Sequence, residues 1–368
     1  MKKKLVLAGG GHAHMMTLAH LNQFVDQGHK VIVIQPSEHH YYSGMGPGML
    51  GGTYAPDEIR FATRRQVEKK GGSFVLGKVA KIDASAQQVF LESGEAVGYD
   101  VLSCNMGSFV PLDMITGDLN DIYTVKPIER MQEAKARVLD LASRKKIAIG
   151  IVGGGPSAVE IAGNLRRLTT AAGMHAAHIK IITGSKIIPR HPSGVRKKVL
   201  HALDKQGIEI VNNCQVREIR TGCVAESSGK CHALDIIFVA VGVKPSQVFK
   251  ASGLSTGPDG GLLVNRYLQS TGHGNIFGGG DCIYFQDTPL DKVGVFAVRE
   301  NPILLHNLMA AMNGGELQPF TAQAKYLLIF NLGDGTGVFY KKPILFGGRA
   351  AFRIKDYIDR KFMKKFQE

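Results

Sequence analysis

The sequence predicts an α/β protein with two domains of related architecture, each built on a parallel sheet. Two observations carry this prediction. An apolar strand that runs into a glycine-rich turn and then a helix-compatible segment opens the chain, and the same arrangement returns near its middle. The 368 residues exceed what a single core usually supports, and the 45 glycines agree with many tight strand-to-helix turns.

The first turn lies within residues 5–16, LVLAGGGHAHMM. Gly9 and Gly11 occupy the first two glycine positions of a G-x-G-x-x-G fingerprint, where a side chain would obstruct the turn or hold the backbone away from a pyrophosphate. The third position, which normally packs helix on strand, is His14. We expect the following helix to run to about Gln27 and to aim its N-terminus at a phosphate.

The first unit continues with a second buried strand at residues 31–34. Gln35 follows it, where a dinucleotide-binding unit usually carries an acid for the adenosine ribose; a glutamine accepts from a hydroxyl more weakly. The Gly/Pro-rich segment 41–54 contains tyrosines and methionines, so we expect it to pass beneath a flat apolar group; a mobile loop is the alternative. The remaining elements expected here are a basic helix at 59–70 and strands at 73–82, 88–91 and 99–108, the last containing Gly107.

The second unit matches the fingerprint better than the first. After an expected helix at 128–143, an apolar strand at 147–152 leads into Gly153 and Gly155. The third small position is Ala158, an accepted substitute for glycine. Two such units in one chain constitute an internal duplication.

The nucleotide preference of the second unit stays open at this stage. Its next strand, 178–183, is followed by a segment with no acid for a ribose. Lys186 and Arg190 are near enough to meet a 2′-phosphate, so NADH and NADPH both fit; two surface bases without a ligand are the alternative. A helix at 195–205 and a buried strand at 234–242 complete the unit.

A third informative stretch is STGHGNIFGGGDCIYF, where a short strand feeds three glycines and then Asp281. This carboxylate can reach a ribose or polyol hydroxyl while the backbone at Gly280 passes close to a cofactor. An ordinary turn aspartate is the alternative. In the helix expected at 293–314, the first amides, near Val295 and Phe296, suit a site where negative charge develops.

Composition limits the partners. The formal charge of +14 favours anionic ones, but nucleic acid is not expected because tryptophan is absent and the basic residues are not interleaved with aromatic ones. The five cysteines show no C-x-x-C pair and no zinc spacing, so we expect no metal site and a reducing, cytoplasmic environment. No run approaches the ~18 to 20 apolar residues that cross a bilayer, so membrane contact would be peripheral, on the inner face of the cell membrane.

The C-terminal stretch GGRAAFRIKDYIDRKFMKKFQE predicts a basic amphipathic helix. Such a helix can lie on anionic lipid, dock on its own protein or join a second subunit in a homodimer. One side would carry Ala351, Ile354, Ile358, Phe362 and Phe366, and the other Arg353, Arg360 and Lys364.

Together these features resemble a known family. Two nucleotide loops, a late G-G-D turn and strand-plus-glycine segments at Gly107 and Gly242 are similar, along nearly the whole chain, to the two-dinucleotide-binding-domain flavoproteins of the pyridine nucleotide-disulfide oxidoreductase superfamily. Because the redox cysteine pair is missing, the chain resembles the type II NADH dehydrogenase branch. The stretches GGGHAH, YYSGMGPGM, GVFAVREN and GRAAFRIKDYIDRKFMKKF look closest to the flavoprotein domain fused ahead of selenide, water dikinase.

The resemblance implies two Rossmann-like domains that bind FAD and NAD(P)H. The FAD-binding domain would comprise residues 1–112 and 258–318, the NAD(P)-binding domain 113–257, and an interface or membrane-contact segment 319–368. Glu160 matches the acid that lies beside nicotinamide and flavin, where it would orient the carboxamide. The implied FAD contacts are Gly9 and Gly11 at the pyrophosphate, Gln35 at the adenosine ribose, Asp281 at the ribityl or pyrophosphate region, and also His12, Ala13, Gly107, Gly280, Val295 and Phe296; the implied nicotinamide-cofactor contacts are Gly153, Gly155, Pro156, Ser157 and Gly242.

The implied activity is transfer of electrons from NAD(P)H through flavin to a quinone or similar acceptor. Quinone dehydrogenases place a glutamine at the start of the flavin-facing helix, where this chain has Val295 and Phe296, which leaves the acceptor open. One alternative is a sulfide:quinone-type oxidoreductase, which needs cysteines beside the flavin; Cys104 and Cys282 lie in suitable segments, but we interpret them as small buried residues. The other is a flavin-containing partner protein linked to selenium metabolism.

Overall fold

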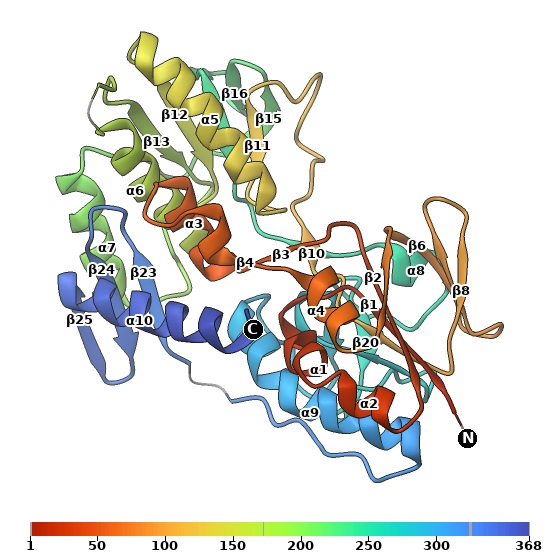
Figure 1. The fold of residues 1–368 in the computed structure, drawn as a ribbon. Coiled ribbons are helices and arrows are strands. Elements are labelled where there is room, and N and C mark those ends of the chain that lie inside the picture. Colours follow the sequence, from red (N-terminus) through yellow and green to blue (C-terminus); the bar gives the residue numbers. More distant parts are fainter. Residues whose placement is uncertain (1, 172, 324–325, 368) are drawn as a thin grey trace.

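The structure is a computed structural model that describes residues 2–171, 173–323 and 326–367. Two five-stranded parallel sheets dominate it and lie in separate halves of the molecule (Figure 1). Helices cover these sheets, and a third group of elements at the C-terminal end bridges the two halves. The predicted α/β class with parallel sheets is therefore confirmed.

The first sheet has the strand order β21–β9–β1–β2–β5, and every neighbouring pair in it is parallel. Its central strand, β1, is buried between two neighbours because its sequence is apolar on both faces. β21 comes from late in the chain, so distant segments form one sheet. The strands are β1 (Lys4–Ala8), β2 (Lys30–Gln35), β5 (Ser73–Leu76), β9 (Val101–Cys104) and β21 (Ile276–Gly278).

The helix predicted to run to Gln27 is interrupted, so that prediction is wrong in detail. The chain tightens at His20 and Leu21, where the amide of Leu21 bonds to the carbonyl of Leu18 (3.4 Å), an i to i+3 bond. The segment therefore divides into η1 (His12–His14), α1 (Met15–Ala19) and α2 (Asn22–Asp26). Other helices of this half are η3 (Pro56–Ile59), α4 (Thr63–Lys69), α8 (Val248–Ala251), η4 (Gly280–Cys282) and α9 (Gly294–Asn313).

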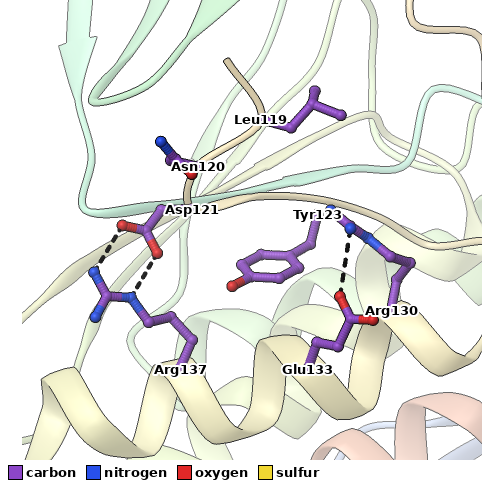
Figure 2. Close-up of a pocket in the computed structure, with 7 residues that line it drawn as sticks. All are labelled: Leu119, Asn120, Asp121, Tyr123, Arg130, Glu133 and Arg137. Carbon is purple, nitrogen blue, oxygen red and sulfur yellow. Dashed lines mark hydrogen bonds and ion pairs between the residues drawn. The ribbon is translucent and has the colours of Figure 1, made fainter.

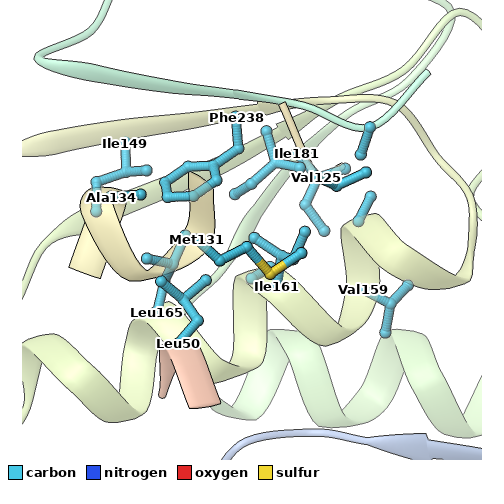
Figure 3. Close-up of a cluster of buried hydrophobic side chains, with 14 of the residues drawn as sticks. Leu50, Val125, Met131, Ala134, Ile149, Val159, Ile161, Leu165, Ile181 and Phe238 are labelled. Atoms are coloured by element: carbon cyan, nitrogen blue, oxygen red, sulfur yellow. The ribbon is translucent and has the colours of Figure 1, made fainter. Parts of the chain in front are cut away.

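The second sheet has the order β11–β18–β12–β13–β14 and is also parallel throughout. Figure 3 shows its core, where Phe238 and Ile149 from the sheet meet Met131 and Leu165 from the covering helices. The strands are β11 (Ile122–Thr124), β12 (Ala148–Val152), β13 (His178–Ile182), β14 (Glu209–Val211) and β18 (Ile236–Val239), and the helices are α5 (Glu129–Arg144), α6 (Pro156–Thr169) and α7 (Ser193–Lys205).

The Gly/Pro-rich segment 41–54 is largely helical, so the alternative of a mobile loop is wrong, while its predicted place beneath a flat apolar group stays a prediction. It forms η2 (Ser43–Met45) and α3 (Gly46–Leu50), and α3 packs against α5 and α6 of the other half. Met45, Met49 and Leu50 are fully buried there. The glycines permit this approach: a Cβ at Gly51 would lie 2.5 Å from Oδ1 of Asn164 on α6.

Shorter pairings complete the two halves. β10 (Ser108–Phe109) pairs with β19 (Lys244–Pro245) where the chain crosses between the sheets. The remaining pairings are β3 (His40–Tyr41) with β4 (Arg60–Phe61), β6 (Val79–Asp83) with β7 (Gln88–Leu91) and β8 (Ala96–Gly98), β15 (Val216–Arg220) with β16 (Cys223–Glu226) and β17 (Cys231–Ala233), and β20 (Leu262–Val264) with β22 (Ile283–Phe285). A disulfide joins Cys223 to Cys231, which the expectation of a reducing environment did not anticipate.

The C-terminal segment forms an antiparallel sheet and a long helix, of which only the helix was expected. The sheet consists of β23 (Leu328–Asn331), β24 (Gly337–Lys341) and β25 (Ile344–Gly348), and α10 (Arg349–Phe366) packs on it. The predicted apolar side of this helix is wrong in part. Its buried residues are Ala351, Lys355, Asp359, Met363 and Phe366, whereas Ile354 and Ile358 are exposed.

Candidate functional site

The two glycine loops have the same construction. Gly9 (φ +92°) and Gly153 (φ +131°) both adopt backbone angles that favour glycine. A Cβ on either would lie 2.2 Å from a backbone carbonyl oxygen at the end of a neighbouring strand, that of Asn105 for Gly9 and that of Ala240 for Gly153. The amide of Gly9 also donates to the carbonyl of Ile34 in β2, and the amide of Gly153 donates to the carbonyl of Ile182 in β13, both at 2.8 Å. The duplication seen in the sequence is therefore a duplication of backbone geometry.

Asn105 completes the first loop. A Cβ on Gly11 would lie 2.5 Å from its side-chain amide. In the amide orientation that satisfies its partners, the oxygen of Asn105 accepts from the amides of Ala13 (2.6 Å) and His14 (3.2 Å). His14 stands where glycine is usual because its ring turns into the protein, with Nδ1 2.5 Å from the carbonyl of Gly9 and Nε2 2.7 Å from the hydroxyl of Ser103. Burial lowers its pKa to about 4, so the ring is neutral.

The side chain of Gln35 binds the backbone of the first loop. Its Oε1 accepts from the amide of Gly10 (3.1 Å), and its Nε2 donates to the carbonyls of Ser37 (2.6 Å) and His39 (2.8 Å). The side chain thus holds the turn and the following segment together. An oxygen of this amide still has a second lone pair with which it could accept a ribose hydroxyl.

Asp281 joins the two halves of the molecule. Its Oδ2 accepts from Nζ of Lys126 (2.5 Å) and from the hydroxyl of Ser108 (2.7 Å). Burial alone would raise the pKa of Asp281, but the lysine and the hydroxyl outweigh it and the pKa is lowered. The carboxylate is therefore charged, and Lys126, which precedes α5, is a site residue that the sequence analysis missed.

Helix α9 positions the G-G-D turn and the first loop. The carboxylate of Glu300 accepts from the amide of Gly280 (2.5 Å), and Asn301 bonds both to the amide of Met16 (2.9 Å) and to the carbonyl of His12 (2.5 Å). Burial raises the pKa of Glu300 to about 7. Val295 and Phe296 lie in the first turn of the same helix, as predicted. The signal for Glu300 and Asn301 was present in the sequence, because Arg299, Glu300 and Asn301 form a polar run between two apolar stretches of the helix.

His12 lies in an aromatic cluster beside the first loop. Its Nδ1 is 3.2 Å from Nε2 of His40, and its ring neighbours those of Tyr42 and Phe362. Burial lowers the pKa of His12 to about 4 although Asp281 acts in the opposite direction. Nε2 of His12 is buried without a partner among the described residues.

Glu160 lies in the first half of α6, where the C-terminal elements meet the second sheet. Its Oε1 accepts from the amide of Asn331 (2.8 Å). Burial raises the pKa of Glu160 to about 7, while Lys355 and the Asn331 amide partly offset that effect. Lys355 in turn bonds to Asp359 (2.7 Å) in a nearly buried ion pair. Glu160 is therefore divided between its charged and neutral forms near neutral pH.

The second loop faces open space. A Cβ on Gly155 or on Gly242 would meet no atom within 4 Å, and Gly242 has a φ of +103°. Pro156 occupies the start of α6, and Ser157 is exposed beside it. Gly155 and Gly242 thus border open space at the carboxyl ends of β12 and β18. Arg190 forms an exposed ion pair with Asp291 (3.3 Å).

An open hollow of about 530 Å³ lies elsewhere in the second half (Figure 2). It adjoins the amino end of β11. Nucleotides bind at the carboxyl ends of the strands in such sheets, so the hollow lies at the opposite edge. Its charges pair within the hollow, Arg137 with Asp121 (2.7 Å) and Arg130 with Glu133 (3.3 Å). The hollow is not part of the nucleotide site. It is lined by Leu119, Asn120, Asp121, Tyr123, Arg130, Glu133 and Arg137.

Comparison with protein families matches residues 3–310 to the pyridine nucleotide-disulphide oxidoreductases. The chain belongs to this family. Among curated relatives, the type II NADH:quinone oxidoreductase of Staphylococcus epidermidis is 24% identical over 391 residues, covering 99% of this chain and 96% of that protein. The NADH dehydrogenase-like protein YutJ of Bacillus subtilis is 24% identical over 360 residues, covering 96% of each chain.

Solved structures of other proteins share the fold. The sulfide:quinone oxidoreductase of Aquifex aeolicus superposes with a TM-score of 0.81 at 19% identity, covering 99% of this chain and 91% of that one. NDH2 from Plasmodium falciparum, solved in complex with NADH, gives 0.80 at 14% identity, covering 100% and 99%. At these identities the likeness concerns the fold.

The residues of this family member fit two dinucleotides. Beside the first loop, a Cβ on Gly107 would meet nothing within 4 Å, and Nε2 of His12 is a buried donor or acceptor with no partner among the described residues. Beside the second loop, Gly155 and Gly242 border open space. Both loops therefore leave room for a dinucleotide.

Two of the free cysteines, Cys104 and Cys282, are not placed for sulfur chemistry. Cys104 and Cys282 are completely buried, and the thiol of Cys282 donates to the carbonyls of Cys104 and Gly279 (both 3.3 Å). Burial raises the pKa of Cys282 to about 12 and that of Cys104 well above its usual value. Neither is a thiolate at neutral pH, so both are structural residues.

Proposed function

We propose that this chain is an FAD-dependent NAD(P)H dehydrogenase that passes electrons to a quinone or a similar acceptor. The observation that carries the proposal is the pair of glycine loops with one backbone geometry, the first adjoining Asp281 and α9 and the second facing open space near Glu160. When bound, FAD supplies the redox chemistry between the nicotinamide donor and the acceptor. The names of the type II NADH:quinone oxidoreductase relatives support the same class.

The protein's own residues bind and orient in this proposal. The first loop, with Asp281 held by Lys126, receives the pyrophosphate and ribityl parts of FAD. Gly153 and Gly155 receive the pyrophosphate of the nicotinamide cofactor. Glu160 accepts a hydrogen bond from the carboxamide and thereby orients the ring. The first amides of α9 present partial positive charge where negative charge develops.

An anaerobic visible spectrum of the purified protein tests the proposal. We expect a bound flavin that bleaches on addition of NADH, NADPH or both, and steady-state oxidation of that nucleotide when a quinone analogue is added. Bleaching by sulfide alone would instead support the sulfide-oxidising alternative, which the buried cysteines disfavour. No bleaching would reject the dehydrogenase.

Selenium metabolism is the second candidate, supported by the sequence stretches that resemble the domain fused to selenide, water dikinase. In that case the protein would act as a flavin-containing partner of a selenophosphate-forming kinase. Negligible turnover with every quinone analogue, together with co-purification of such a kinase, would favour this role over the dehydrogenase.

We further propose that α10 rests on an anionic membrane surface. No helix among residues 2–171, 173–323 and 326–367 is long and apolar enough to cross a bilayer. However, Ile354, Tyr357 and Ile358 share one exposed face of α10, with exposed fractions of 37%, 66% and 39%. The basic residues of the same helix, Lys361 among them, are exposed beside them. Apolar and basic groups together suit the headgroup region.

A double variant, Ile354→Asp with Ile358→Asp, tests the membrane contact. We expect it to lose binding to anionic vesicles in flotation while it keeps its flavin. Leu119→Asp is the matched control, because Leu119 is 45% exposed in the other half of the molecule. If the double variant binds vesicles normally but changes from dimer to monomer in light scattering, the face is a homodimer interface and the membrane proposal fails.

A further inference from the structure

Three possible metal ligands converge away from both glycine loops. The ligand atoms of Cys214, Glu226 and His232 all lie within 4.8 Å of one another. Cys214 lies between β14 and β15, Glu226 ends β16, and His232 is the middle residue of β17. Their sequence spacing resembles no zinc motif, so only the fold brings them together.

The three side chains are close to the spacing that a zinc ion requires. With ligand bonds of about 2.0–2.1 Å to nitrogen or oxygen and about 2.3 Å to sulfur, donor atoms around tetrahedral zinc are about 3.3–3.6 Å apart. Nε2 of His232 is 2.7 Å from Oε1 of Glu226. This pair must therefore open by about 0.6 Å, an adjustment that side-chain torsions can supply.

The site is shielded from solvent. The side chains of His232 and Glu226 are 4% and 18% exposed, and Cys214 is 4% exposed. Water would therefore compete weakly for the ligands, while the partly exposed carboxylate leaves a path for entry.

Neighbouring contacts orient the ligands. Oε2 of Glu226 accepts from the hydroxyl of Ser228 (3.0 Å), which leaves Oε1 turned toward His232. The hairpin of β16 and β17 pairs Val224 with His232 and so fixes the backbone beneath both ligands. The amide of Cys214 donates to the carbonyl of Thr183 (3.0 Å) at the end of β13.

We propose that Cys214, Glu226 and His232 bind a zinc ion, with a water molecule at the fourth position. A thiolate, an imidazole and a carboxylate together favour zinc over calcium or magnesium, which take oxygen ligands. Binding replaces the proton of the Cys214 thiol with the metal, so one proton is released for each zinc bound. No oxidant or reductant is involved.

The bound ion would tie the β15–β16–β17 sheet to the second nucleotide-binding loop. Cys214 holds the carbonyl of Thr183, and a Cβ on Gly154 would lie 2.3 Å from Oγ1 of the same threonine. The site is therefore structural, and Thr183 connects it to the second nucleotide-binding loop. The proposal does not depend on the catalytic function of the protein.

The disulfide cysteines form a separate feature. Side chains alternate between the two faces of a strand, so Cys231 and His232 point to opposite faces of β17. The bridge from Cys231 to Cys223 lies on the face away from the three ligands. The pair therefore supplies a matched control on the same small sheet.

Metal analysis of the full, flavin-containing chain tests the site. After incubation with zinc chloride and gel filtration, we expect one zinc per chain in the wild type and less than a tenth of that in Cys214→Ser and in His232→Gln. The double variant Cys223→Ser with Cys231→Ser should retain one zinc. No zinc in the wild type, or zinc lost from the double variant and kept in Cys214→Ser, would overturn the proposal.

Cobalt(II) provides a second readout that does not depend on comparing folded variants. Cobalt(II) loaded in place of zinc should give a thiolate-to-metal charge-transfer band and visible bands at wavelengths longer than flavin absorption. Their appearance in the wild type would support a site that includes Cys214. A cobalt spectrum without the thiolate band would exclude the cysteine and refute the ligand set.

Discussion

The titration of Glu160 makes the most direct prediction about turnover. Burial raises the pKa of this carboxyl from 4.5 to about 7, so its ionised fraction changes strongly within the range where the protein can be assayed. For a pKa of about 7, roughly 9% of the groups are ionised at pH 6 and roughly 91% at pH 8. If the ionised carboxylate orients the nicotinamide, flavin reduction at subsaturating nucleotide should accelerate by about tenfold between these pH values.

The variant Glu160→Gln removes this titration without removing the structural bond. An amide oxygen still accepts from the amide of Asn331, so the fold and the flavin content should stay unchanged. We expect flavin reduction in the variant to be slow and nearly constant from pH 6 to pH 8. Stopped-flow absorbance of the flavin under anaerobic conditions measures the rate directly.

Glu300 supplies the necessary control because its pKa is also raised to about 7 by burial. Glu300 bonds to the amide of Gly280 and not to residues of the second loop. In Glu300→Gln the tenfold rise with pH should therefore persist, whatever happens to the absolute rate. A rise that persists in Glu160→Gln and disappears in Glu300→Gln would refute the role assigned to Glu160.

Three further predictions concern binding and stability. Gly11→Val should yield protein without flavin because a Cβ at Gly11 would lie 2.5 Å from the side-chain amide of Asn105. Gly155→Val, where the Cβ faces open space, should keep its flavin and bind NAD(P)H weakly; a full flavin complement in Gly11→Val would contradict the assignment of the first loop. Lys355→Met should lower the free energy of unfolding in urea by about 3–5 kcal/mol because it leaves the buried carboxylate of Asp359 without its cation, and adding Asp359→Leu should restore most of this loss. If Lys355→Met is as stable as the wild type, the Lys355–Asp359 ion pair does not stabilise the fold. The pKa of Asp281 is lowered in the folded protein, so this group stabilises the fold above its unfolded pKa near 3.8, and the contribution is lost as the pH falls. Asp281→Asn should therefore be less stable at pH 7 and lose less stability on acidification; unfolding curves that superimpose on those of the wild type would argue against the ion pair with Lys126.

Short-range constraints explain why much of the fold could be read from the chain. The apolar strand before each loop and the glycines within it are required by contacts a few residues away. The strand expected at 88–91 is β7 with the same bounds, and the helix expected at 195–205 is α7, which begins two residues earlier. Periodicity and turn chemistry are local properties, so they survive without knowledge of the tertiary structure.

The errors came where a distant partner decides the outcome. For segment 41–54 the alternative of a mobile loop failed, because packing on α5 and α6 makes the segment largely helical and buries it. In α10 the charged residues Lys355 and Asp359 face inward because they bond to each other. In addition, Lys355 donates to the carbonyl of Gly44, and Asp359 accepts from the hydroxyl of Tyr42. An amphipathic pattern alone would always place these charges in water.

The sequence by itself determined the α/β class, the duplicated nucleotide-binding turn and the family, because each rests on residues adjacent in the chain. Only the tertiary structure decided that Lys126 pairs with Asp281, that Glu300 holds the G-G-D turn and Asn301 the first loop, and that Glu160 meets the C-terminal segment. Three of these contacts join residues far apart in the chain, with separations of 155 residues for Lys126 and Asp281, 289 for Asn301 and His12, and 171 for Glu160 and Asn331. The desolvation that raises the pKa of Glu160 also depends on what packs around it, so no local pattern could have predicted it.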